Sequence, residues 1–145
     1  MTLSLVIPVW NDPDGLARLL RQVAELDLFA SILVCDDASM PPCRPADLGF
    51  DEAALGIHYL RNETRRGAGH ARNLGLDAVA TDHVLFFDSD DLMTAALVSL
   101  WRELAGLDFD FCLFRHIDSR QRNLPGPTVL GPPQVDQALW QQAGL

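Results

Sequence analysis

The sequence predicts an α/β domain with a mostly parallel, Rossmann-like sheet and helices on both of its faces. Short apolar runs alternate with longer segments of helical periodicity along the first 114 residues. Two of the apolar runs stop at clusters of aspartates, at the strand ends where open α/β sheets bind their ligands. With 145 residues, 48% of them hydrophobic, the chain has enough apolar material for a globular core.

The first half of the predicted sheet is a strand, a helix and a second strand. Residues 3–8 form an apolar run that Pro8 should end, because proline cannot donate to a strand ladder. Residues 16–26 carry apolar side chains at helical spacing, and residues 31–35 form the next strand, which Asp36 and Asp37 close. The proline-containing stretch 40–56 is a loop to which we assign no regular structure.

The second half repeats the alternation. We predict strands over residues 57–60, 83–87 and 109–114 and helices over 69–80 and 94–104. The prolines and glycines of residues 123–133 should break regular structure before a short helix over 135–143. We therefore predict an α/β domain over residues 1–116, which would be the ligand-binding part, and an irregular C-terminal extension over 117–145.

Composition excludes several classes of protein. The formal net charge of −9 argues against nucleic-acid binding, and every basic residue is an arginine. The absence of lysine excludes P-loop ATPases, Schiff-base enzymes and pyridoxal-phosphate enzymes. It also argues against the remaining alternative of a phosphotransfer domain, either a response-regulator receiver or a haloacid-dehalogenase-type phosphatase, because both need a lysine. The three cysteines lack metal-ligand spacing and should be free thiols. Because neither a signal peptide nor a long apolar run is visible, we expect a cytoplasmic protein.

The most informative segment follows the apolar run 83–87, where Asp88, Asp90 and Asp91 place three carboxylates in four positions. Hard oxygen ligands of this kind suit Mg²⁺ or Mn²⁺ that carries phosphate oxygens. A competing interpretation makes Asp91 the N-cap of the helix that follows. Asp36 and Asp37 close a parallel strand in the same way and should face the same crevice, although aspartate also begins ordinary turns.

A basic, glycine-containing loop runs from residue 62 into the helix predicted after it. Its arginines and backbone amides could meet an anion, and the competing interpretation is a solvated loop. Together with the two acidic segments, it resembles the nucleotide-sugar-dependent glycosyltransferases of family 2, which have the GT-A fold. The matching motifs lie in family order between residues 3 and 104: Val6 to Asn11, Asp36 to Ser39, Gly67 with Ala71-Arg72-Asn73, and Asp88 to Asp91.

The resemblance implies a role for each matching residue. Pro8, Val9 and Asn11 would line the pocket for the base, and Trp10 would stack there in place of the tyrosine usual in the family. Asp37 would accept a hydrogen bond from a uracil-type base, and Arg72 would lie near the base or the phosphates. Asp88 would lie near the ribose and the metal, Asp90 would ligate the metal, and Asp91 would assist it.

The family further implies a function. We expect Mn²⁺- or Mg²⁺-dependent, inverting transfer of a sugar from a nucleoside diphosphate sugar, with a UDP-sugar favoured, to an acceptor hydroxyl in polysaccharide biosynthesis. The acceptor would be a saccharide or a lipid-linked molecule, the latter with peripheral association at the inner face of the membrane. The alternative is a non-catalytic or truncated nucleotide-sugar-binding module.

The acceptor half of such an enzyme is not identifiable in the sequence. The chain stops before it, no residue matches a family general base, and we therefore expect donor binding with poor transfer. Apolar residues in the tail, Val135, Leu139 and Trp140, favour a homodimer that covers them.

Overall fold

A computed structural model of the chain describes residues 1–109, 111–113 and 128–130. The chain divides into two compact units, Met1–Trp101 and Arg102–Leu145. The predicted boundary after residue 116 and the predicted helix over 135–143 lie outside the described residues. Within them, no helix has both the length and the apolar character that a membrane span requires.

The first unit contains a four-stranded sheet whose strands are all parallel. The strands are β1 (Leu3–Val9), β2 (Ser31–Asp36), β3 (Ile57–Arg61) and β4 (His83–Phe86), in the spatial order β3-β2-β1-β4. All seven residues of β1 are buried, as expected for a strand with neighbours on both sides and helices on both faces. The predicted parallel α/β sheet is therefore confirmed.

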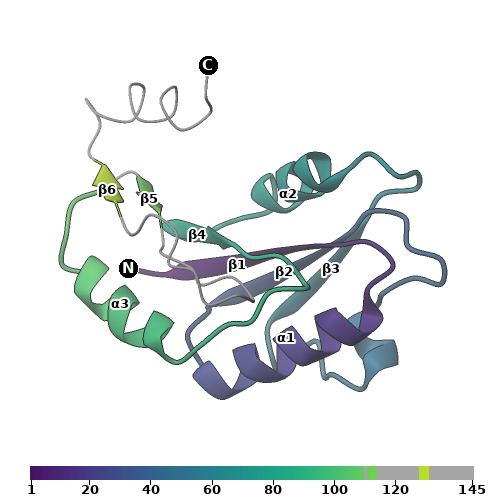
Figure 1. The fold of residues 1–145 in the computed structure, drawn as a ribbon, viewed down its shortest axis with the longest axis horizontal. Helices are drawn as coiled ribbons and strands as arrows, with labels where there is room; N and C mark the ends of the chain where they lie inside the picture. The colour runs from purple at the N-terminus through teal and green to yellow at the C-terminus, as the bar shows by residue number, and fades with distance from the viewer. Residues whose placement is uncertain (110, 114–127, 131–145) are drawn as a thin grey trace, which may run out of the picture. The chain divides into compact units, whose positions relative to one another are not determined.

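Helices cover the two faces of this sheet. The helices are α1 (Pro13–Leu26), α2 (Ala68–Leu76) and α3 (Ala96–Leu104), with a 3₁₀ turn η1 at Pro45–Leu48. The helices α1 and α2 lie on opposite sides of the sheet (Figure 1). On the α2 side, Val6, Leu33, Cys35 and Ala71 form a buried cluster. A Cβ atom on Gly75 would stand 2.6 Å from Val6 Cγ1, so glycine lets α2 approach the sheet closely.

Pro8 does not end β1, contrary to the prediction. Thr2 and Val6 accept ladder bonds from the β4 side, from the N–H groups of His83 and Phe87, whereas Val9 accepts from Asp37 on the β2 side. Pro8 is in phase with Val6, so its missing N–H faces β4, which ends at Phe86. The strand therefore continues to Val9 on its β2 side, where the register with β2 runs through Pro8 and Val9.

Helix boundaries also differ from the predictions. The helix α1 begins at Pro13, three residues earlier than expected, because the Asp12 carboxylate caps it by accepting the Gly15 N–H at 3.1 Å. The helix α2 ends at Leu76. Since α3 begins only at Ala96, Asp91 is not its N-cap; the Asp91 N–H instead donates to the Asp88 carbonyl in a tight turn.

The second unit contains the last two strands. β5 (Phe111–Leu113) pairs with β6 (Thr128–Leu130) in a separate antiparallel sheet. The prediction that the strand over 109–114 extends the parallel sheet is therefore wrong, and so is the expectation that 123–133 lacks regular structure throughout. A three-residue run with two β-branched residues, Thr128 and Val129, is long enough to pair even between prolines.

Candidate functional site

A pocket of about 370 Å³ opens at the carboxyl ends of β1, β2 and β4. Parallel strands bring their ends to one edge of the sheet, which is why residues distant in sequence meet here. Six of the residues predicted for the site line this pocket. The described residues that line it are Pro8, Val9, Trp10, Asp12, Asp37, Arg65, Gly67, Ala68, Ala71, Asp88, Ser89 and Asp90.

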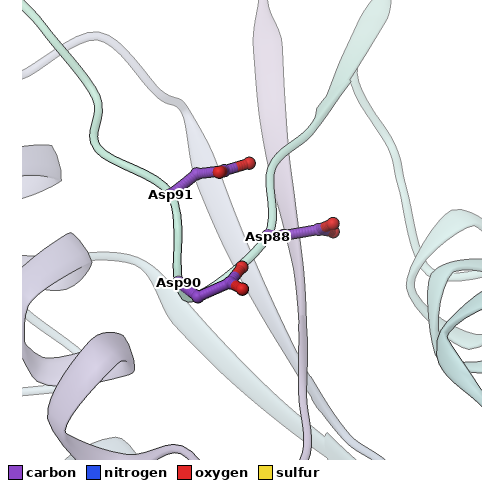
Figure 2. Close-up of side chains that lie close together, drawn as sticks. All are labelled: Asp88, Asp90 and Asp91. Carbon is purple, nitrogen blue, oxygen red and sulfur yellow. The ribbon is translucent and has the colours of Figure 1, made fainter. Parts of the chain in front are cut away.

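The acidic segment after β4 forms one side of the site. Carboxylate oxygens of Asp88, Asp90 and Asp91 lie within 4.8 Å of one another, as the sequence pattern predicts. All three side chains project to the same side of their loop (Figure 2). Asp88 is half-buried, and Asp90 and Asp91 are exposed. Three mutually close carboxylates suit a hard divalent cation such as Mg²⁺ or Mn²⁺.

Arg72 contacts this acidic segment but does not line the pocket. Its Nη2 atom is 2.6 Å from Asp88 Oδ1, so the arginine predicted to lie near the base or the phosphates holds a carboxylate. A charge-assisted bond of this length fixes the orientation of the Asp88 carboxylate. The arginine therefore positions a candidate metal ligand.

Asp37 is 3% exposed and lies between β2 and the basic loop. Its carboxylate accepts hydrogen bonds from Asn62 Nδ2 at 2.8 Å and from the N–H groups of Arg66 at 2.9 Å and Gly67 at 2.7 Å. Burial alone would raise the pKa of Asp37, but these hydrogen bonds and the charge of Arg65 outweigh it and lower the pKa. One of about four acceptor directions, on Oδ2, is left for a ligand.

Asp36 does not face the pocket, although it is adjacent to Asp37. Its fully buried carboxylate accepts from the N–H groups of Ser39 and Cys43, from the Tyr59 hydroxyl at 2.6 Å and from Arg61 Nη1 at 2.8 Å. The turn interpretation is therefore correct for Asp36. Burial would raise its pKa, and the hydrogen bonds from these partners outweigh burial and lower it.

Trp10 stands at the mouth of the pocket with 44% of its surface exposed. The guanidinium carbon of Arg65 lies 3.5 Å from the centre of its ring, in a cation–π stack. The basic loop is thus not simply solvated. Arg65 belongs to the site, but the sequence offered no sign of which arginine in the loop would reach the tryptophan.

Asn11 has a different place from the one predicted. Its backbone is left-handed (φ 49°), its N–H donates to Ser39 Oγ at 2.8 Å, and its Oδ1 accepts from the Met40 N–H at 2.9 Å. It lines a second hollow of about 410 Å³ beside the prolines of residues 41–42. Asn11 therefore ties the turn after β1 to the loop after β2.

Two further lining residues, Asp12 and Ser89, went unnoticed in the sequence. Asp12 Oδ2 accepts a hydrogen bond from Ser89 Oγ at 2.8 Å, and Ser89 is buried. The dipeptide Asp12-Pro13 is a common start of a helix, so the cap could have been predicted. The hydrogen bond with Ser89, which lies 77 residues away in the sequence, could not be predicted.

Comparison with known proteins shows the family of the chain. The family model described as "Glycosyl transferase family 2" matches residues 4–130. The pre-mycofactocin glycosyltransferase of Mycobacterium tuberculosis is 39% identical over 87 residues, which are 60% of this chain and 17% of that protein.

Two solved structures have a similar fold. TarS residues 1–349 from S. aureus, crystallised with UDP, align with a TM-score of 0.64 at 25% identity, over 72% of this chain and 32% of that one. Glucosyl-3-phosphoglycerate synthase from Mycobacterium tuberculosis, crystallised with Mn²⁺, UDP and glucosyl-3-phosphoglycerate, aligns with a TM-score of 0.52 at 26% identity. That alignment covers 69% of this chain and 37% of the synthase. The chain spans less than half of each of these proteins.

Proposed function

Because the chain belongs to glycosyl transferase family 2, we propose that it holds a nucleoside diphosphate sugar and a divalent metal for transfer of the sugar to an acceptor hydroxyl. The main observation behind this proposal is that the carboxylates of Asp88, Asp90 and Asp91 lie together at a pocket large enough for part of a nucleotide. The solved relatives crystallised with UDP, one of them also with Mn²⁺, support the same class of ligand.

Asp90 and Asp88 would hold the metal, with Asp91 assisting. Their hard oxygen atoms fit Mn²⁺ or Mg²⁺, and their mutual repulsion gives a bound cation a large stabilising role. When bound, such a metal neutralises charge on the diphosphate leaving group. The chain's own residues supply the frame: Arg72 orients Asp88, and Trp10 with Arg65 offers a stacking platform for a base.

A uridine nucleotide is the ligand we favour. Asp37 Oδ2 keeps one acceptor direction and lines the pocket, and the imide N–H of uracil is a donor that cytosine and adenine lack at the equivalent edge. Guanine also carries an N–H at its pairing edge, so guanosine diphosphate is the informative competitor. In thermal-shift titrations with Mn²⁺, UDP should stabilise the chain more than CDP or ADP at equal concentration. A larger shift with CDP or ADP would contradict the assignment of Asp37.

We further propose that the sugar is transferred to the acceptor with inversion at the sugar carbon. No carboxylate that follows the acidic segment in the sequence matches a general-base motif of the family, so we assign no general base. The acceptor would be a saccharide or a lipid-linked hydroxyl compound, the latter bound at a membrane surface. The alternative function is a module that binds the nucleotide sugar without turnover. Calorimetry that detects donor binding, combined with a transfer assay that detects no product, would favour this alternative.

The direct test replaces Asp90 by asparagine. Asp90→Asn should weaken Mn²⁺-dependent binding of UDP by at least about tenfold, because one charged ligand is lost from the cluster. Asp77→Asn, an exposed change at the end of α2, removes the same charge away from the pocket and should bind normally. Equal affinity of the Asp90→Asn variant and the unchanged chain, with and without chelator, would refute the metal assignment.

A further inference from the structure

The helix α1 holds the acidic loop through side chains that lie far from it in the sequence. Each of its three contacts fixes a different point of the loop, two of them on the backbone. The bonds are Ser89 Oγ to Asp12 Oδ2 at 2.8 Å, Arg18 Nη2 to the Asp90 carbonyl at 3.0 Å, and the Met93 N–H to Gln22 Oε1 at 3.1 Å. The strand β4 ends at Phe86, so strand pairing does not hold the loop after it. These contacts and the Arg72–Asp88 pair hold the loop instead.

Asp12 has two partners in this arrangement. Its Oδ1 atom accepts the Gly15 N–H and caps α1, while Oδ2 accepts from Ser89 in the acidic loop. It lines the pocket beside Asp88 and Asp90. The group of carboxylates close enough to share a cation does not include it. Asp12 therefore contacts the candidate metal site through a neighbour of the ligands.

We propose that Asp12 is a positioning residue of the metal site. By binding Ser89, it holds the loop in the conformation that presents Asp88 and Asp90 together to a divalent cation. The inference rests on the proposed metal-dependent nucleotide binding. The physical reason is entropic: a loop that is ordered before the metal arrives does not have to be ordered by metal binding.

Gly15 supports this assignment. A Cβ atom at position 15 would stand 2.1 Å from Asp12 Oδ2, the oxygen that accepts from Ser89. The backbone of α1 at this position is ordinary helix, so the glycine is not needed for a special conformation. The space above Gly15 is thus occupied by the Asp12 carboxylate in its bridging position, which any larger residue would displace.

The first test measures Mn²⁺ affinity by calorimetry in the presence of saturating UDP, with thermal unfolding to verify the fold. Ser89→Ala removes the donor, and Asp12→Ser keeps an N-cap oxygen but is too short to reach Ser89. Each should weaken Mn²⁺ binding by about tenfold, the usual effect of a lost bond to a charged group, and the double variant should add little. Ser99→Ala and Asp14→Ser, exposed changes of the same kinds, serve as matched controls and should bind as the unchanged chain does.

Gly15→Ala gives a second test. Alanine favours a helix interior over glycine, but its Cβ would also crowd the Asp12 oxygen that caps α1, so the two effects on stability offset and the melting temperature should change little. The inference expects Mn²⁺ affinity to fall about as far as in Ser89→Ala while the protein stays folded, because the Asp12 carboxylate is pushed off Ser89.

The possible outcomes distinguish a failure of the proposed function from a failure of the positioning role of Asp12. If the unchanged chain shows no Mn²⁺-dependent UDP binding, the proposed function fails, and the role of Asp12 fails with it. If the unchanged chain binds and Ser89→Ala and Gly15→Ala bind equally well, the proposed function stands and the positioning role is overturned. Loss of Mn²⁺ affinity in both, with normal melting, supports the role.

Discussion

Asp36 and Asp90 belong to acidic clusters at the same edge of one parallel sheet, yet their surroundings are opposite. Asp36 is fully buried and accepts four hydrogen bonds, from two backbone N–H groups, a tyrosine and an arginine. Asp90 is exposed, and a carboxylate oxygen of its side chain lies within 4.8 Å of oxygens of two other carboxylates. The supply of donors thus decides what a strand-end aspartate does: surrounded by donors it stabilises the fold, and surrounded by acceptors it is available to a cation.

The largest effect on stability is expected at Asp36, the buried member of this comparison. Asp36→Asn should lower the free energy of unfolding by about 2–4 kcal/mol, because it leaves the Arg61 guanidinium without its partner and replaces an acceptor by a donor facing N–H groups. Urea unfolding at neutral pH measures the loss. Asp77→Asn should stay within about 0.5 kcal/mol of the unchanged chain. A midpoint for Asp36→Asn equal to that of the control would show that the buried network contributes nothing to the fold.

The pH dependence of stability should follow from the same network. The pKa values of Asp36 and Asp37 are lowered in the folded protein, so the folded state favours their charged forms. Their contribution is complete above the unfolded pKa of about 3.9 and is lost as the pH falls through the lower folded values. The stability difference between the unchanged chain and Asp36→Asn, measured by urea unfolding, should therefore narrow below about pH 4. A difference that stays constant down to pH 2.5 would contradict the lowered pKa of Asp36.

Arg72 should combine a small effect on stability with an effect on metal binding, and so lies between the buried Asp36 network and the acidic loop. Its ion pair with Asp88 is short, but both side chains are more than a third exposed, so Arg72→Gln should cost less than about 0.5 kcal/mol of stability. The same change should weaken Mn²⁺-dependent UDP binding, because Asp88 loses its orienting partner. Parallel urea and calorimetry series separate the two effects. A large loss of stability with normal binding would place Arg72 in the structural class with Arg61.

The smallest effect on stability is expected at Asp90. Without metal, Asp90→Asn removes one of three neighbouring negative charges and should leave the urea midpoint unchanged or slightly higher. The midpoint should respond to added Mn²⁺ and UDP in the unchanged chain but much less in the variant. Marked destabilisation of the metal-free variant would mean that Asp90, like Asp36, is satisfied within the fold.

The sequence was sufficient for the fold of the first unit and for the position of the acidic loop. Apolar runs and helical periodicity predict its strands and helices to within a few residues, because burial on both faces requires such patterns. It was insufficient at Pro8, where the outcome depends on which neighbour the missing N–H faces. It also could not place β5, since a three-residue strand carries no mark of its partner.

Within the site, residue type was predictable and orientation was not. The pair Asp36-Asp37 reads as two equivalent acids, and only the fold sends one to the buried network and the other to the pocket. Arg65 and Asp12 were missed because their partners, Trp10 and Ser89, lie far away in the sequence. Such contacts follow from tertiary packing, which local patterns do not encode.

The stack of Arg65 on Trp10 means that tryptophan fluorescence can report on the pocket. Indole emission depends on the charge and the solvent beside the ring, and here a guanidinium lies 3.5 Å above a half-exposed indole. A flat base that enters must either displace the guanidinium or insert beside it, and both events change that environment. With Trp101 and Trp140 replaced by phenylalanine, Trp10 would be the sole emitter among the three tryptophans of the chain. The protein thus carries an intrinsic fluorophore at the mouth of the candidate site.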